Sequence, residues 1–98
     1  MVEDIVGCKW SLAVLERVRH GVNRPGALEQ SLPGLSTKVL NERLRKLQRC
    51  GIVRRTAYPE LPLRVEYALT PFGNEFVQGL DAVAALEREL ESERAVSA

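Results

Sequence analysis

Two strand-like segments joined by a proline-bracketed tip constrain the fold more than any other part of the chain. Residues Gly51–Thr70 have the sequence GIVRRTAYPELPLRVEYALT. The flanks Ile52–Tyr58 and Arg64–Leu69 are rich in Val, Ile, Thr and Tyr, which suit a pleated, half-buried surface. Pro59 and Pro62 cannot donate ladder hydrogen bonds and they fix φ, so strand pairing stops between the flanks and the tip is stiff. The segment therefore predicts a two-stranded hairpin with a rigid tip.

A capped helix is expected directly before this hairpin. The Leu-Pro-Gly-Leu sequence at 32–35 indicates a turn, and Ser36 after it is a favoured N-cap residue. Apolar side chains then recur at helical spacing and predict one buried stripe, made of Leu40, Leu44 and Leu47. Gly51 suits the left-handed residue that ends a helix. Rotation by 100° per residue places Lys38, Glu42, Arg45 and Arg49 opposite the buried stripe, with Asn41 and Lys46 on its shoulders.

Positive charge is concentrated in this helix and hairpin. Residues 36–64 hold eight basic and two acidic side chains, a net charge of +6. Residues 1–35 are neutral overall and residues 65–98 carry −5, so the whole chain is only +1. A basic middle beside an acidic tail is typical of a local face that binds a polyanion. The alternative is an ordinary solvated surface.

Three further helices complete the expected order of elements. Lys9–Arg19 is apolar over much of its circumference, so this helix is either central to the core or shared with a partner. Pro25 begins a short helix over about Gly26–Ser31, and Val22–Arg24 before it is a candidate short strand. Thr70 and Pro71 supply an N-cap and a first-position proline for a long final helix.

The order helix, short strand, helix, turn, helix, hairpin, long helix is that of a winged helix-turn-helix. We expect a mainly α fold with a small β-hairpin, as one domain over residues 1–94 and a frayed tail at 95–98. In this geometry the helix after the turn enters the major groove of double-stranded DNA. The expected DNA-binding residues are Ser36, Thr37, Lys38, Asn41, Arg45, Lys46, Arg49 and Arg64. Those near the helix start reach base edges or the nearest phosphates, whereas Arg45 and Arg49 contact either bases or the backbone.

The remaining arginines have structural alternatives. Arg43 lies at the edge of the buried stripe, where a pair with Glu66 inside the domain is at least as plausible as a DNA contact. Strand alternation sends Arg54 and Arg55 to opposite faces, so we expect one of them to form a surface ion pair. Arg64 follows the tip directly and is expected to be the strongest contact of the wing.

No catalytic or metal-binding pattern is recognisable. The sequence has no nucleophile–base pair, phosphate-binding loop or metal motif, so we expect neither an enzyme nor a cofactor. His20 has no partner at catalytic or metal spacing, and a helix-end or surface role is expected. Cys50 at a helix end is expected to be structural. Cys8 lies at a helix start beside Lys9, where a thiol pKa falls, so a redox role is an alternative to packing. No apolar run is long enough for a membrane span, which favours a cytoplasmic protein.

Three blocks of sequence resemble a known family. GCKWSLAVLERV, LPGLSTKVLNERLRKLQRCGIVRR and YPELPLRVEYALTPFG are similar to the signature blocks of HxlR-type winged helix-turn-helix transcription regulators, and the resemblance spans residues 3–85. It implies a bacterial homodimer on a palindromic operator, with the DNA-reading helix at Ser36–Cys50 and the wing at Tyr58–Val65. The first and last helices would build the dimer, through Trp10, Leu12, Leu15, Phe76, Leu80, Val83, Leu86 and Leu90.

The resemblance has departures and alternatives. Leu63 replaces the second proline that the family usually has after Pro62, and Cys8 replaces a glycine. Many members that sense aldehydes, quinones or oxidants use a cysteine ahead of the first helix, and we expect that this mechanism does not transfer to the chain. The final helix could instead fold back over its own domain. The main functional alternative is a protein-interaction module that no longer binds DNA; another is a regulator with a small-molecule effector between Trp10 and the final helix.

Overall fold

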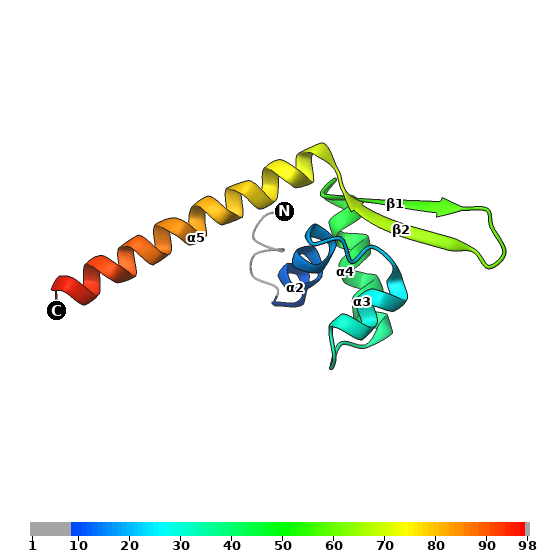
Figure 1. The fold of residues 1–98 in the computed structure, drawn as a ribbon, viewed down its shortest axis with the longest axis horizontal. Coiled ribbons are helices and arrows are strands. Elements are labelled where there is room, and N and C mark those ends of the chain that lie inside the picture. Colours follow the sequence, from blue (N-terminus) through cyan, green and yellow to red (C-terminus); the bar gives the residue numbers. More distant parts are fainter. Residues whose placement is uncertain (1–8, 98) are drawn as a thin grey trace.

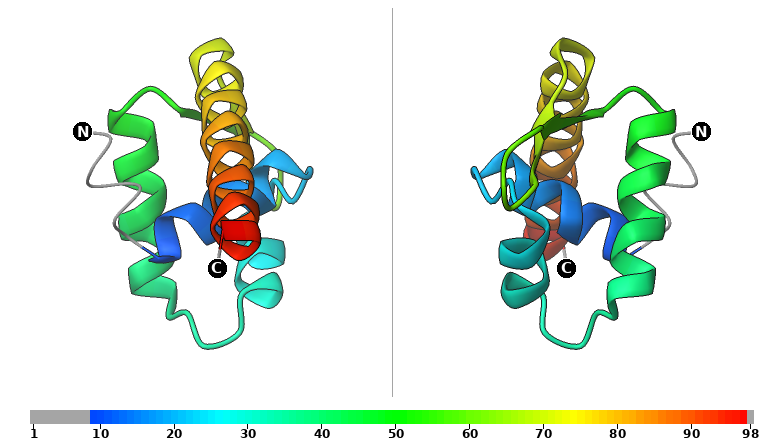
Figure 2. Two further views of the ribbon diagram at one scale, coloured as in Figure 1. Left: turned by 90° about the vertical axis from the view of Figure 1, so that its left-hand side faces the viewer. Right: turned by 90° about the vertical axis from the view of Figure 1, so that its right-hand side faces the viewer.

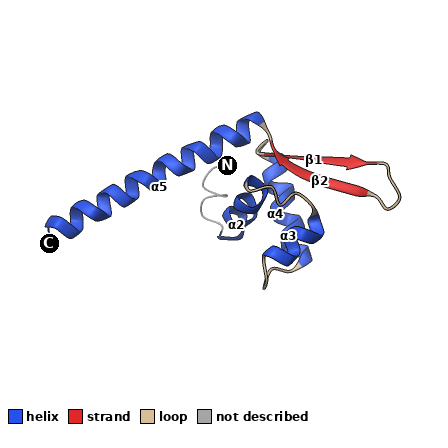
Figure 3. Cartoon of the chain, viewed as in Figure 1, coloured by secondary structure: helices blue, strands red, loops and turns tan. Residues whose placement is uncertain are grey.

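A computed structural model describes residues 9–97 and shows a small helical body with two projections (Figures 1 and 3). A hairpin extends from one side of the body, and a long helix leaves from the other. The elements in order are α2 (Lys9–Arg19), α3 (Pro25–Ser31), α4 (Thr37–Arg49), β1 (Val53–Tyr58), β2 (Arg64–Leu69) and α5 (Pro71–Ser97). The expected winged helix-turn-helix, mainly α with one β-hairpin, is therefore confirmed.

Local sequence signals define the ends of the helices as expected. The Ser36 hydroxyl caps α4 by accepting a hydrogen bond from the Val39 amide at 3.2 Å. The Thr70 hydroxyl caps α5 in the same manner, accepting from the Gly73 amide at 2.9 Å. Gly51 follows α4 with φ at +74°, a conformation that glycine adopts without the steric cost of a Cβ. The chain therefore turns sharply out of α4 and into the hairpin.

The core lies where α2 crosses α4 and the base of the hairpin. Figure 2 shows α2 between α4 on one side and α3 on the other. The predicted stripe of α4 is fully buried here, against side chains of α2 and α3 and the residue after Gly51. The largest fully buried apolar side chains are Val14, Leu15, Leu28, Leu40, Leu44, Leu47 and Ile52. Burial of a leucine side chain contributes about 1.5–3 kcal/mol, so this cluster fixes how α4 is presented.

The hairpin is antiparallel, and its register determines the two faces of the wing. Arg55 lies opposite Tyr67, and Tyr58 lies opposite Arg64. Because side chains alternate, Arg55 shares a face with the buried Val53 and Tyr67, whereas Arg54 and Arg64 lie on the other face. The body-facing side therefore carries one arginine, Arg55.

The loop before α3 does not form the expected short strand. The sheet of the described chain has two strands, β1 and β2. The carbonyl of Asn23 accepts one hydrogen bond, at 2.7 Å, from the backbone amide of Tyr67. Pro25 follows almost at once, and its ring cannot donate to a ladder, so pairing does not extend. The prediction of a strand at Val22–Arg24 is therefore wrong.

Helix α5 packs on the body only near its beginning. Val77 is buried, but Val83, Leu86 and Leu90 are 53%, 63% and 47% exposed. Figure 1 shows the second half of the helix projecting away from the body, so the alternative of a helix folded back over its own domain is wrong. The helix extends to Ser97, because no helix-breaking residue interrupts its end.

None of the helices within residues 9–97 is long and apolar enough to cross a membrane.

Candidate nucleic-acid interface

Helix α4 presents most of the predicted contact residues on an open surface. Its N-cap, its first turn and its outward face are exposed, because the opposite stripe of leucines is buried in the body. The exposed members of the predicted set are Ser36, Thr37, Lys38, Asn41, Arg45 and Arg49, while Lys46 is half-buried on a shoulder. The structure thus brings the predicted residues of α4 together on one side of one rigid helix.

A groove lies between α4 and the hairpin. Its volume is about 470 Å³, and its lining comes from three elements: Pro25 of α3; Asn41, Arg45 and Gln48 of α4; and Arg55, Val65 and Tyr67 of the hairpin. The three α4 residues are four and three positions apart, which puts them on one face of the helix. Two arginines and two amides therefore surround a concave surface, and none of the described residues that line it is a carboxylate.

Arg55 is the charged residue of this groove that the sequence-based contact set lacks. It comes from β1, whereas Arg45 comes from α4, so their convergence depends on how the hairpin packs against the body. Arg55 pairs with Tyr67, an aromatic residue on the core-facing side of the hairpin. This pairing is the feature that could have identified Arg55 as a residue of the groove. The packing of the hairpin against α4, which brings Arg55 to the groove, is not specified by these local signals.

Arg64 is held by neighbours on the wing. Its guanidinium lies 3.1 Å from the Glu60 carboxylate and 3.6 Å from the Glu66 carboxylate. It also stacks on the Tyr58 ring at 4.0 Å from the centroid, a cation–π geometry. The side chain is 32% exposed. Its positive charge is thus offset locally by two carboxylates, and the residue stiffens the wing next to the tip.

Two sequence-based expectations about ion pairs are wrong. Glu66 pairs with Arg64 and, at 3.9 Å, with Arg24, so it is not the partner of Arg43. The Nε of Arg43 is buried without a hydrogen-bond partner. Neither Arg54 nor Arg55 forms an ion pair with any residue that the structure describes. The carboxylates near the hairpin are instead used by Arg24 and Arg64, which reach them from the adjoining loop and from β2.

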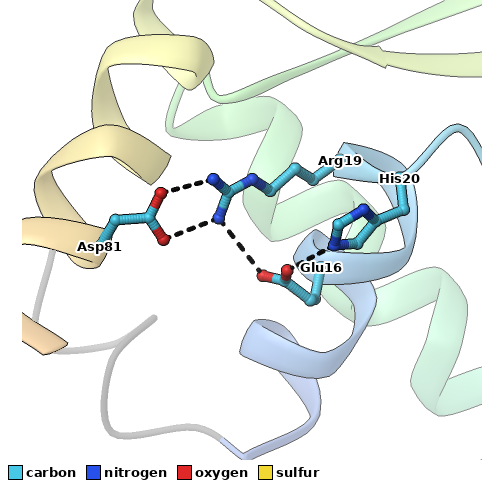
Figure 4. Close-up of polar contacts among 4 residues, drawn as sticks. All are labelled: Glu16, Arg19, His20 and Asp81. Atoms are coloured by element: carbon cyan, nitrogen blue, oxygen red, sulfur yellow. Dashed lines mark hydrogen bonds and ion pairs between the residues drawn. The ribbon is translucent and has the colours of Figure 1, made fainter. Parts of the chain in front are cut away.

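A polar cluster fixes the start of α5 against α2 (Figure 4). Both guanidinium nitrogens of Arg19 donate to the Asp81 carboxylate, one of them at 2.8 Å. The same guanidinium lies 3.8 Å from Glu16, which is 2.8 Å from Nε2 of the exposed His20. The hydrogen bond from Arg19 lowers the pKa of Asp81, and the same hydrogen bond raises the pKa of Arg19. Because the pKa of Asp81 is lowered, the pair persists at neutral pH and is lost only as pH falls through that lowered value.

A second groove of about 320 Å³ runs between α2 and α5. It is lined by Leu12, Leu15, Glu16, Arg19, Val77, Leu80, Asp81, Val83, Ala84 and Glu87. Leu15 is only 1% exposed and forms its floor, as part of the core. Trp10, Leu12, Phe76 and Leu80 are half-buried against that core. The exposed apolar surface continues outward along α5 from Val83.

Of the two cysteines, Cys50 lies in the part of the chain that the structure describes. Cys50 caps the C-terminal end of α4 and is half-buried, which agrees with a packing role. Cys8 lies outside the described residues. Within residues 9–97, no group of three or more His, Cys, Asp or Glu side chains could hold a metal ion.

A family model, sequence relatives and solved structures all match this chain to helix-turn-helix transcriptional regulators. The model of the HxlR-like helix-turn-helix family matches residues 5–95. An uncharacterized HTH-type transcriptional regulator of Synechocystis sp. is 47% identical over 85 residues, which are 87% of this chain and 63% of that protein. The regulator YtcD of Bacillus subtilis is 32% identical over 84% of this chain and 65% of its own length. The chain thus spans less than two thirds of these relatives.

Solved structures share the architecture. A transcriptional regulator of the MarR family from Enterococcus faecalis superposes with a TM-score of 0.86 at 32% identity, over 95% of this chain and 84% of that one. The regulator YodB of B. subtilis superposes in its reduced form with a TM-score of 0.77 at 28% identity, over 86% and 82% of the two chains. Its diamide-treated form gives 0.81 at 27%, over 90% and 87%. The chain therefore belongs to the HxlR-like helix-turn-helix family.

Proposed function

We propose that this protein is a transcription regulator that binds double-stranded DNA as a homodimer on a palindromic operator. The observation that carries the proposal is the exposed basic face of α4, held rigidly beside a hairpin by a fully buried leucine stripe. The net charge of +6 over residues 36–64 matches a polyanionic ligand. Family membership supports the same ligand, because the relatives are named as HTH-type transcriptional regulators.

In the proposed complex α4 enters the major groove and the hairpin lies against the adjacent minor groove or its phosphates. The N-cap and first turn of α4 approach the bases, where Asn41 suits the acceptor–donor pair of adenine. Lys46 and Arg49 lie further along the helix and contact the backbone. Arg64 remains among the proposed DNA-binding residues, because it is the basic residue nearest the tip of the wing. The carboxylates of Glu60 and Glu66 hold its side chain in place.

The proposed dimer uses α2 and α5. Its support is the run of exposed apolar side chains on the projecting half of α5, beginning at Val83 and ending at Leu90. A helix of 27 residues with such a face gains most of its stability from packing against a partner. A symmetric dimer would present two copies of α4 to half-sites about one helical turn, or a multiple of it, apart.

The proposal predicts a steep dependence of DNA affinity on salt. If about six phosphates are neutralised by the dimer, the association constant should fall roughly 10³-fold between 50 and 200 mM monovalent salt. Fluorescence anisotropy with labelled duplexes, selected by the purified protein from random DNA, measures this directly. An affinity that does not change with salt would contradict a phosphate-contacting interface.

A protein-interaction module is the alternative function, and the same experiment separates it from a regulator. A module that had lost DNA binding would select no sequence from random DNA and would shift no promoter fragment in a gel. The distribution of basic residues over both α4 and the hairpin favours DNA, because a groove-reading helix and a wing are the two parts that meet a duplex.

Thiol control is a second candidate property, favoured by one finding: YodB, to which this chain is similar, has been solved in a reduced and in a diamide-treated form. If Cys8 is the reactive thiol, diamide should weaken operator binding by the wild type and not by Cys8→Ser. Cys50→Ser is the matched control, because that thiol is half-buried at the C-terminal end of α4. Equal responses of wild type and Cys8→Ser to diamide would exclude Cys8.

A further inference from the structure

The groove between α4 and the hairpin is where two arginines from different elements converge. Arg45 comes from the outward face of α4, and Arg55 comes from the body-facing side of β1. Among residues 9–97, no carboxylate lines the groove. Neither arginine forms an ion pair with another residue in the part of the chain that the structure describes. Neither guanidinium is thus held by a carboxylate of residues 9–97, in contrast to that of Arg64 on the opposite face.

The walls of this groove are rigid and polar. Tyr67 is 6% exposed and Val65 is half-buried, so the hairpin side is anchored in the core. On the α4 side the Gln48 amide donates to the Leu44 carbonyl at 3.2 Å, which holds that side chain along the helix. Asn41 lies one turn before Arg45 on the same face. An anion entering the groove would meet two guanidinium groups without needing to displace an internal partner.

The position of the groove identifies the anion. The major and minor grooves of a duplex are separated by one sugar–phosphate strand at each edge. If α4 occupies the major groove and the wing occupies the neighbouring minor groove, that strand must pass between them. The space between α4 and the wing is this groove. Guanidinium groups suit the site, because their planar donors match phosphate oxygens two at a time.

We propose that the groove between α4 and the hairpin seats the DNA strand that separates the two grooves, with Arg55 and Arg45 as its phosphate contacts. This inference rests on the proposed DNA binding and adds two statements to it. Arg55 joins the interface although the sequence pattern did not select it. Arg45 was expected to contact either the bases or the backbone of DNA, and the inference assigns it to the backbone.

Arg55→Gln tests the proposal, and Arg54→Gln is its matched control. The two residues are adjacent, exposed and identical in charge, but Arg54 points to the other face of the hairpin and does not line the groove. In a dimer, Arg55→Gln removes two phosphate contacts, so the slope of log affinity against log salt should decrease by about 1.8 and affinity near 0.1 M salt should fall roughly 10- to 100-fold. Arg54→Gln should leave the slope at the wild-type value.

The measurement uses the full chain with two duplexes, a selected operator and a random sequence. A phosphate contact is blind to sequence, so Arg55→Gln and Arg45→Gln should weaken both duplexes by the same factor. Arg55→Lys should keep the slope while losing part of the affinity, because ammonium retains the charge but not the fork of donors. Melting temperatures of all variants establish that each is folded.

The outcomes are distinguishable. Equal slopes for Arg55→Gln, Arg54→Gln and wild type would overturn the inference while leaving DNA binding intact. A loss confined to the operator would show that the mutated arginine reads bases and would overturn its assignment to phosphate. Failure of the wild type to bind either duplex would overturn the proposed function, and the inference with it.

Discussion

A Leu86→Glu, Leu90→Glu variant is expected to be monomeric and to lose at least about 100-fold in operator affinity, because two linked half-site contacts bind more tightly than one by 10²- to 10⁴-fold. Both leucines are exposed on the projecting half of α5, so two carboxylates there would have to be desolvated in a helix–helix interface. Light scattering after size-exclusion chromatography measures the mass, and anisotropy measures the affinity.

The control for this variant is Arg88→Gln, Ser92→Glu. It changes the net charge by the same two units on the opposite side of the same helix. The core should remain folded in both variants, since the projecting half of α5 contributes no described residue to the hydrophobic core. A Leu86→Glu, Leu90→Glu protein that remains dimeric and binds the operator normally would contradict an interface on α5.

Gly73→Ala is expected to destabilise the fold by about 3 kcal/mol or more, the upper range for overpacking a rigid site. A Cβ at Gly73 would lie 2.0 Å from the carbonyl oxygen of Ile52. That carbonyl cannot move freely, because it accepts a hydrogen bond from the Thr70 amide at 3.0 Å. The Thr70 hydroxyl in turn accepts from the Gly73 amide. The added methyl therefore clashes with the junction that joins the start of α5 to the end of α4.

Gly79→Ala is the matched control on the same helix. Nothing lies within 4 Å of a Cβ at Gly79, so the substitution should raise stability by about 0.5–1 kcal/mol through helix propensity alone. Thermal unfolding by circular dichroism, at one protein concentration, should show a melting temperature lowered by at least about 10 °C for Gly73→Ala and slightly raised for Gly79→Ala. Equal melting temperatures would show that the α4–α5 junction tolerates the added volume.

The structural features that depend on neighbouring residues were predicted correctly from the sequence. Ser36 and Thr70 cap the helices that they were expected to cap, because a short hydroxyl side chain reaches a backbone amide three residues ahead. The stripe through Leu40, Leu44 and Leu47 is buried, since helical spacing places those side chains on one side whatever they pack against. The proline positions correctly marked where the hairpin pairing stops.

The contacts of side chains with residues distant in the sequence were not predicted correctly. A pair with Glu66 was one of two alternatives for Arg43, but Glu66 is held by Arg24 and Arg64. The same apolar criterion selected Leu12 and Leu15, yet Leu15 is buried in the core and Leu12 is half-buried against it. Periodicity gives the direction of a side chain around its helix and not the distance to the next element. Arg55 was missed for the same reason.

The chain's local chemistry alone therefore determined the order of helices, the rigid hairpin and the concentration of charge between residues 36 and 64. Each depends on contacts within a few residues, which spacing and residue type specify. Only the tertiary structure decided which of those charges are available. It pairs Arg64 with carboxylates on one face of the wing and leaves Arg55 beside Arg45 on the other. The reason is that charge compensation depends on strand register and on the packing of the hairpin against α4, both of which arise from contacts distant in sequence.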